Sequence, residues 1–214
     1  MRFQDRAEAG RELAGLLVEL CEREGLTDPL VLALPRGGIA VAEPVARALD
    51  APLDVLVVRK IGAPHHQEFA VGALAADDPP LFHTDTLAML GLTEESLAPA
   101  VERERAELRR REERYRGDRP PPDPAGRTVI VVDDGLATGA TACAALRHVR
   151  RRRPAHLVLA VPVGAPDSLE SLADEADTVV CPHRPAGFAA VGQWYADFEQ
   201  LTDEQVIAAL HAQH

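Results

Sequence analysis

The chain has 214 residues, of which 46% are hydrophobic, and a formal net charge of −11. These values suit one domain with a substantial core and exclude a disordered chain. The acidic balance argues against nucleic acid or an anionic membrane as a partner, and no apolar run approaches the ~20 residues of a membrane-spanning helix. The three cysteines (Cys21, Cys143 and Cys181) lack metal-ligand spacing, so we expect reduced thiols in a cytoplasmic protein.

The first third of the chain predicts a helix followed by a strand–helix–strand unit. Asp5 and Glu8 form a capping-box pattern ahead of leucines at helical spacing, which predicts a helix over residues 6–24. Short apolar runs and a Pro-Arg-Gly-Gly break then predict a strand, a loop, a helix and a second strand. Their expected ranges are 30–34, 35–38, 39–49 and 53–58. This order is typical of a parallel sheet.

The middle of the chain predicts an insertion, from about residue 61 to 118, that begins as a flap hairpin. Strand-like segments at 69–75 and 81–83 would form the hairpin, and Thr93 would cap a long charged helix over 94–116. One face of this helix carries a narrow apolar stripe that packs either on the body or on a partner subunit, so a homodimer stays open. The stripe consists of Leu97, Val101, Leu108 and Tyr115.

The second half of the chain repeats the strand–helix alternation. Strands are expected at 129–132, 156–161 and 178–181, and helices at 139–152 and 166–175. A small C-terminal hood, about 182–214, would hold a loop and a helix from Asp203. We therefore expect a single domain over residues 1–214, an α/β fold with a central parallel sheet of about five strands and helices on both faces.

The segment from Val129 to Thr141 carries the strongest chemical signal. Apolar β-branched residues run into Asp133 and Asp134, and a loop of small and hydroxyl-bearing residues follows. The carboxylates should lie at the carboxyl edge of a buried parallel strand, where open α/β sheets bind ligands. The loop opens a helix, whose N-terminus favours phosphate. A sugar phosphate, with its diol on the carboxylates and its phosphate in the loop, fits both parts.

Two other protein classes share an apolar run that ends in paired aspartates. P-loop NTPases also need a glycine-rich loop ending in Gly-Lys, and Lys60, the only lysine of the chain, has no such glycines before it. Receiver domains carry their acidic pair near the start of the chain, unlike this one. The sugar-phosphate interpretation is therefore favoured.

The segment resembles the phosphoribosyl-pyrophosphate site of the type I phosphoribosyltransferases. The resemblance implies that Asp133 and Asp134 hold the ribose 2- and 3-hydroxyls and that the following loop holds the 5-phosphate. The implied loop residues are Ala137, Thr138, Gly139, Ala140 and Thr141. It also implies an α/β fold with a mobile flap over residues 61–85, which would close to exclude water.

Two further segments are candidates for pyrophosphate binding. Gly37 and Gly38 let the backbone approach a ligand closely, and Arg36 can bind an anion bidentately. A tight strand-to-helix turn is the simpler alternative for these residues, but they resemble the family's pyrophosphate loop. Arg59 and Lys60 end the next predicted strand, so they should face the same crevice. The alternative is that they are simply solvent-exposed charges at the end of that strand. The resemblance implies that they contact pyrophosphate oxygens.

An aromatic segment near the C-terminus resembles the hood of the hypoxanthine-type members. The resemblance implies that Phe188 stacks on the acceptor base and that Asp197 helps to hold a second metal ion. Trp194 is an alternative stacking residue, although aromatic residues here could equally belong to the core. One position departs from the pattern: Ala137 stands where 6-oxopurine members have an aspartate that serves the purine N7. Adenine-type members also carry alanine there.

Together these resemblances imply an Mg²⁺-dependent phosphoribosyltransferase of nucleotide salvage. It would transfer the 5-phosphoribosyl group from phosphoribosyl pyrophosphate to a nucleobase-like acceptor and release pyrophosphate. Lys60, Asp133 and Asp134 are the expected catalytic residues, and Asp133, Asp134 and Asp197 the expected Mg²⁺ ligands. A non-catalytic regulator that binds phosphoribosyl pyrophosphate is the main alternative. A phosphatase or nucleosidase would need a water-activating base, which the sequence does not place.

Overall fold

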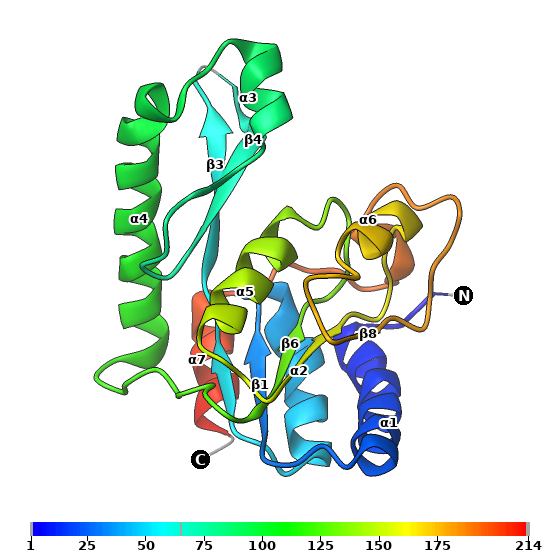
Figure 1. The fold of residues 1–214 in the computed structure, drawn as a ribbon. Helices are drawn as coiled ribbons and strands as arrows, with labels where there is room; N and C mark the ends of the chain where they lie inside the picture. Colours follow the sequence, from blue (N-terminus) through cyan, green and yellow to red (C-terminus); the bar gives the residue numbers. More distant parts are fainter. Residues whose placement is uncertain (1, 65, 213–214) are drawn as a thin grey trace.

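The centre of the protein is a five-stranded parallel sheet with the order β2-β1-β6-β7-β8, seen in a computed structural model that describes residues 2–64 and 66–212 (Figure 1). All neighbouring strands pair in parallel. The strands are β1 (Pro29–Ala33), β2 (Leu53–Val55), β6 (Thr128–Val132), β7 (His156–Ala160) and β8 (Thr178–Val180). The predicted α/β fold with about five parallel strands is confirmed.

Helices cover both faces of this sheet. Alternate strand residues feed two separate cores: Val31 packs with α1 (Arg6–Glu24) and α2 (Gly37–Ala48), whereas Leu32 packs with α5 (Ala140–Arg151). The short helix α6 (Pro166–Ser171) joins α5, and the C-terminal helix α7 (Asp203–His211) joins α1 and α2. Because both faces are buried, the strands consist almost wholly of apolar residues.

A second, antiparallel sheet carries the flap. It is formed by β3 (Val58–Ala63), β4 (His66–Ala75) and β5 (Leu81–Phe82), followed by α3 (Thr84–Leu90) and α4 (Glu94–Arg116). In Figure 1 the flap projects from the central sheet with α4 beside β3. The apolar stripe of α4 is buried within its own chain, where α4 contacts the flap strands β3 and β4 and the helix α7, so the stripe is not exposed for a dimer contact. Leu97, Leu108 and Tyr115 are at most 1% exposed, and Val101 is 8% exposed.

The predicted strand over 53–58 is wrong in its extent. β2 ends at Val55, and the chain leaves the parallel sheet before β3 starts at Val58. Leu56 and Val57 are buried between the two sheets, so the apolar run continues although the pairing partner changes. Arg59 and Lys60 consequently lie inside β3, opposite Leu74 and Ala73 of β4, and do not end a parallel strand.

The other boundaries differ little from expectation. Helix α3 was not predicted, because it has seven residues and buries only Leu87, which gives little periodicity. Helix α6 ends at Ser171, four residues earlier than expected. All three cysteines are free thiols, with Cys181 buried and the other two partly exposed. Among residues 2–64 and 66–212, no helix has the length and apolar character needed to cross a membrane.

Candidate functional site

A cleft of about 500 Å³ opens where the carboxyl ends of β1 and β6 meet the flap. Its lining comes from four parts of the chain that are far apart in sequence. The first two are the loop after β1 (Leu34, Pro35 and Gly37) and the segment after β6 (Asp133, Asp134 and Thr141). The flap strand β3 supplies Val58, Arg59, Lys60 and Gly62, and α4 supplies Arg103, Glu104 and Arg111. The cleft therefore joins a carboxylate end to a flap side rich in cations.

Strand β6 places Asp133 and Asp134 at the carboxyl end of the cleft. All five residues of β6 are buried, so the chain leaves the core at the first carboxylate. The backbone N–H of Asp134 donates to Asp133 Oδ1 at 2.8 Å, and Arg6 Nε donates to Asp134 Oδ2 at 2.8 Å. Burial, and then the neighbouring Asp134 charge, raise the pKa of Asp133 well above its usual range. Burial also raises the pKa of Asp134, against the opposing effect of Arg6.

The loop after β1 packs directly on these carboxylates. A Cβ at Gly37 would lie 2.0 Å from Asp134 Oδ2, and one at Gly38 would lie 2.7 Å from the carbonyl oxygen of Val132. Both glycines are therefore required by the close approach of the loop to the end of β6. The loop thus makes the tight turn that was the simpler alternative, and that turn brings its backbone beside the acidic pair.

Arg36 points away from this cleft. Its Nη1 atom lies 4.0 Å from Asp203 Oδ1 in α7, and the residue is absent from the cleft lining. The peptide bond between Pro35 and Arg36 is cis. The predicted pyrophosphate loop is therefore divided. Its backbone around Gly37 borders the cleft, whereas the Arg36 guanidinium lies near Asp203 of α7.

The cations of the cleft come from the flap. Lys60 is exposed and lines the cleft. Arg59 also lines it, but its Nε and Nη2 atoms donate to one carboxylate oxygen of Glu104, at 2.9 and 2.7 Å. Arg103 and Arg111 of the cleft lining were not predicted, because the many charged residues of α4 are typical of a solvent-exposed helix face. The only available signal was their spacing of eight residues, which places both on the same side of a helix.

The loop after Asp134 leads into α5 as the sequence predicts. Gly139 has φ +76° and precedes α5, which begins at Ala140 and has no side-chain cap. Thr141 lines the cleft, whereas Ala137 and Thr138 are exposed beside it. The N-terminus of α5 is therefore available to an anion from the cleft side.

The residues of the hood lie outside the cleft lining. Phe188 is half-buried, and Trp194 packs against a small core of Phe3, Ala9 and Tyr195. Asp197 is exposed, and its Oδ1 accepts a hydrogen bond from the backbone N–H of Glu199 at 3.1 Å. The structure thus brings Asp133 and Asp134 together but does not bring Phe188, Trp194 or Asp197 into the cleft with them.

Comparison with known proteins agrees with this geometry. Residues 2–193 match the family model of the phosphoribosyl transferase domain. The chain belongs to the phosphoribosyl transferase family. Two curated proteins from Mycobacterium tuberculosis strains, named provisionally as phosphoribosyl transferases, are 43% identical over 99% of this chain. The match covers 47% of each relative, so the chain spans about half the length of these proteins.

Two solved structures share this fold. Protein TT1426 from Thermus thermophilus is 45% identical, with a TM-score of 0.82 over 100% of this chain and 99% of that one. Protein AQ2163 from Aquifex aeolicus is 12% identical, with a TM-score of 0.53 over 97% of this chain and 85% of that one. The second likeness shows the fold alone.

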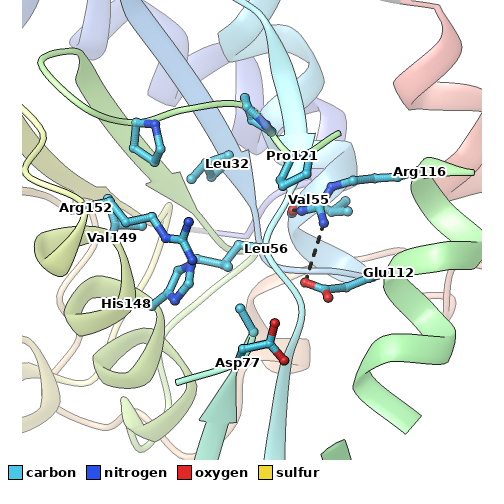
Figure 2. Close-up of a pocket in the computed structure, with 13 residues that line it drawn as sticks. Leu32, Val55, Leu56, Asp77, Glu112, Arg116, Pro121, His148, Val149 and Arg152 are labelled. Carbon is cyan, nitrogen blue, oxygen red and sulfur yellow. Dashed lines mark hydrogen bonds and ion pairs between the residues drawn. The ribbon is translucent and has the colours of Figure 1, made fainter. Parts of the chain in front are cut away.

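This phosphoribosyl transferase domain also holds a smaller cavity, about 130 Å³, at the junction of the flap and the core (Figure 2). Its base is apolar, with Leu32 and Leu56, while Glu112 and Arg116 face it from α4 and His148 from α5. Burial raises the pKa of Glu112 and lowers that of His148. None of the predicted site residues lines this cavity, which therefore belongs to the flap junction.

Proposed function

We propose that this domain transfers the 5-phosphoribosyl group of phosphoribosyl pyrophosphate to a nucleobase-like acceptor and releases pyrophosphate, as a pentosyltransferase. The observation that carries the proposal is the pair of buried carboxylates, Asp133 and Asp134, set at the end of β6 against a glycine loop and a helix N-terminus. A diol and a phosphate are the groups that such an arrangement binds. Family membership supports the same chemistry.

Each end of the donor has residues suited to it. In this proposal Asp133 and Asp134 accept the ribose hydroxyls, and residues 137–141 bind the 5-phosphate. Gly37, Gly38 and Lys60 are the proposed contacts of the pyrophosphate. Arg59 can join them once its bond to Glu104 is released. Arg36 would first have to turn from Asp203.

The carboxylates also suit a magnesium ion that arrives with the substrate. Mg²⁺ is usually bound by one or two carboxylates together with substrate phosphates and water, which matches Asp133 and Asp134. Among the residues that the structure describes, no group of three or more His, Cys, Asp or Glu side chains forms a metal site. Asp197 lies outside the lining, and its metal role stays a prediction. When bound, Mg²⁺ would neutralise charge on the departing pyrophosphate.

The protein's own residues would act mainly by positioning and charge. Displacement at the anomeric carbon breaks its bond to pyrophosphate, and negative charge grows on the leaving group. Lys60 lies on the flap side of the cleft and would stabilise that charge, while the carboxylates fix the ribose. Phe188 and Trp194 stay the predicted contacts of the acceptor ring. A role in nucleotide salvage and a cytoplasmic location are part of the same proposal.

Calorimetric titration of phosphoribosyl pyrophosphate with Mg²⁺ tests the central claim. We expect saturable binding to the wild type and none to the folded Asp133→Asn/Asp134→Asn variant. Exchange of labelled pyrophosphate into the donor, with a panel of nucleobases, then tests transfer. Binding without any exchange would favour a non-catalytic regulator, and absence of binding by the folded wild type would reject the proposal.

A further inference from the structure

The first residue of α1 reaches the end of β6. Arg6 Nε donates to Asp134 Oδ2 at 2.8 Å, across 128 positions of sequence. The two side chains are only 10% and 14% exposed, so this ion pair is largely withdrawn from water. A surface pair of this kind contributes little, but a buried carboxylate that loses its partner is strongly destabilised. Asp134 therefore depends on Arg6.

The Arg6 guanidinium is fixed on its other sides by the C-terminal segment. Its Nη1 donates to the carbonyl oxygen of Glu199 at 2.9 Å, and its central carbon lies 3.9 Å from the centre of the Phe198 ring. Tyr195 stacks on Phe198 and donates its hydroxyl hydrogen to the backbone carbonyl of Asp134 at 2.6 Å. A planar guanidinium held by a carboxylate, a carbonyl and a ring has little rotamer freedom.

Asp134 is consequently restrained at both ends. Its side chain is tied through Oδ2 to Arg6, and its backbone is tied through the carbonyl to Tyr195. Of its two carboxylate oxygens, only Oδ1 lacks a bond to Arg6. The hood segment that carries Tyr195, Phe198 and Glu199 thus contacts the acidic pair through Arg6 and the Asp134 backbone.

We propose that Arg6 is a positioning residue, which holds Oδ2 of the Asp134 carboxylate and so orients its other oxygen, Oδ1, toward a ribose hydroxyl of the donor. The inference rests on the proposed function, because it assigns the ribose end of the same cleft. A guanidinium stays protonated at any working pH, so the orientation is kept throughout. A purely structural ion pair, which only holds the hood on α1, is the alternative.

Two probes separate these roles: phosphoribosyl pyrophosphate, which uses the ribose end, and inorganic pyrophosphate, which does not. Both are titrated without Mg²⁺, because Asp134 is itself a proposed Mg²⁺ ligand, into the wild type, Arg6→Ala and Arg6→Lys. We expect Arg6→Ala to weaken phosphoribosyl pyrophosphate binding ~30-fold or more, as for a buried charge that loses its partner, and to leave pyrophosphate binding within about 3-fold. Arg6→Lys should recover part of the loss. The matched control is Arg23→Ala, on the same helix but in an exposed pair with Glu24.

A double change guards against a folding defect. Arg6→Ala/Asp134→Asn also removes the carboxylate that loses its partner in Arg6→Ala. This variant should bind phosphoribosyl pyrophosphate as Asp134→Asn alone does, because both changes act through one group. Equal losses for the two probes, or additive losses in the double variant, would overturn the positioning role. A folded wild type that binds pyrophosphate but not phosphoribosyl pyrophosphate would instead reject the proposed function, and this inference with it.

Discussion

The two sides of the cleft are built in different ways. The carboxylate end is part of the core: Asp134 is fixed by Arg6 and lies against Gly37. On the flap side, Lys60 is exposed and Arg59 is already bound to a glutamate. The carboxylate end, the proposed ribose site, is therefore preorganised. At the proposed pyrophosphate site, Arg59 must first release the Glu104 carboxylate before it can bind a phosphate oxygen. Preorganised groups bind at a lower cost than groups that must rearrange.

The largest effect should come from the preorganised end. Asp133→Asn removes one of two acceptors for the ribose hydroxyls, so we expect phosphoribosyl pyrophosphate affinity to fall ~100-fold or more, as when a buried charged hydrogen-bond partner is lost. Titration calorimetry measures this change. A loss below about 10-fold would show that the carboxylate end does not dominate donor binding.

A smaller loss is expected on the flap side. Lys60→Met removes an exposed cation but keeps the length of the side chain, so pyrophosphate affinity should fall ~10-fold and decline less steeply with added salt. Lys60→Arg should keep most of the affinity, because it keeps the charge. An unchanged affinity in Lys60→Met would place pyrophosphate away from β3.

The Glu104 carboxylate offers a change in the opposite direction. Glu104→Gln weakens the bond to Arg59 and frees its guanidinium for phosphate oxygens, so pyrophosphate affinity should rise ~3-fold, the modest worth of a partly exposed ion pair. Glu43→Gln is the control, since Glu43 also pairs with an arginine, Arg47, and neither residue lines the cleft. Weaker binding in Glu104→Gln would mean that the bond positions Arg59 for the ligand.

The last prediction concerns the stability of the free protein and not ligand affinity. The pKa values of Asp133 and Asp134 are raised by burial, so the native state binds protons that the unfolded state has lost. The contribution of the pair to stability is therefore greatest in acid and is lost as pH rises through these raised pKa values. Asp133→Asn should stabilise the free protein at pH 7 by roughly 1 kcal/mol. Denaturant unfolding at several pH values measures this, and a gain that does not grow with pH would contradict it.

The sequence predicts those features that are local. The helices at 6–24 and 94–116 have the predicted bounds, because Asp5 and Thr93 cap them and an apolar stripe follows each cap. Asp133 and Asp134 lie at the carboxyl end of the buried strand β6, as its apolar sequence predicts. The split after Val55 could not be predicted, because burial of Leu56 looks the same whichever sheet it packs on.

The part of the site that escaped prediction is made by distant contacts. Arg6 and Asp134 meet only in the folded protein, in which α1 packs on α2, and no spacing in the sequence marks their contact. Arg103 and Arg111 line the cleft because α4 lies along β3, which a charged helix pattern does not reveal. Local patterns thus give the carboxylates but not the residues that orient or face them.

The buried stripe of α4 has a consequence for the thermodynamics of ligand binding. Because Leu97, Leu108 and Tyr115 are already buried and α4 contacts β3, β4 and α7, the flap helix is folded before any ligand arrives. A segment that orders on binding loses conformational entropy, about 1–2 kcal/mol for each residue. A flap that is already folded avoids this loss, and its closure would be a rigid rotation about a hinge. Its closure over a bound diphosphate should therefore show a small heat-capacity change in calorimetry, unlike the folding of a disordered loop.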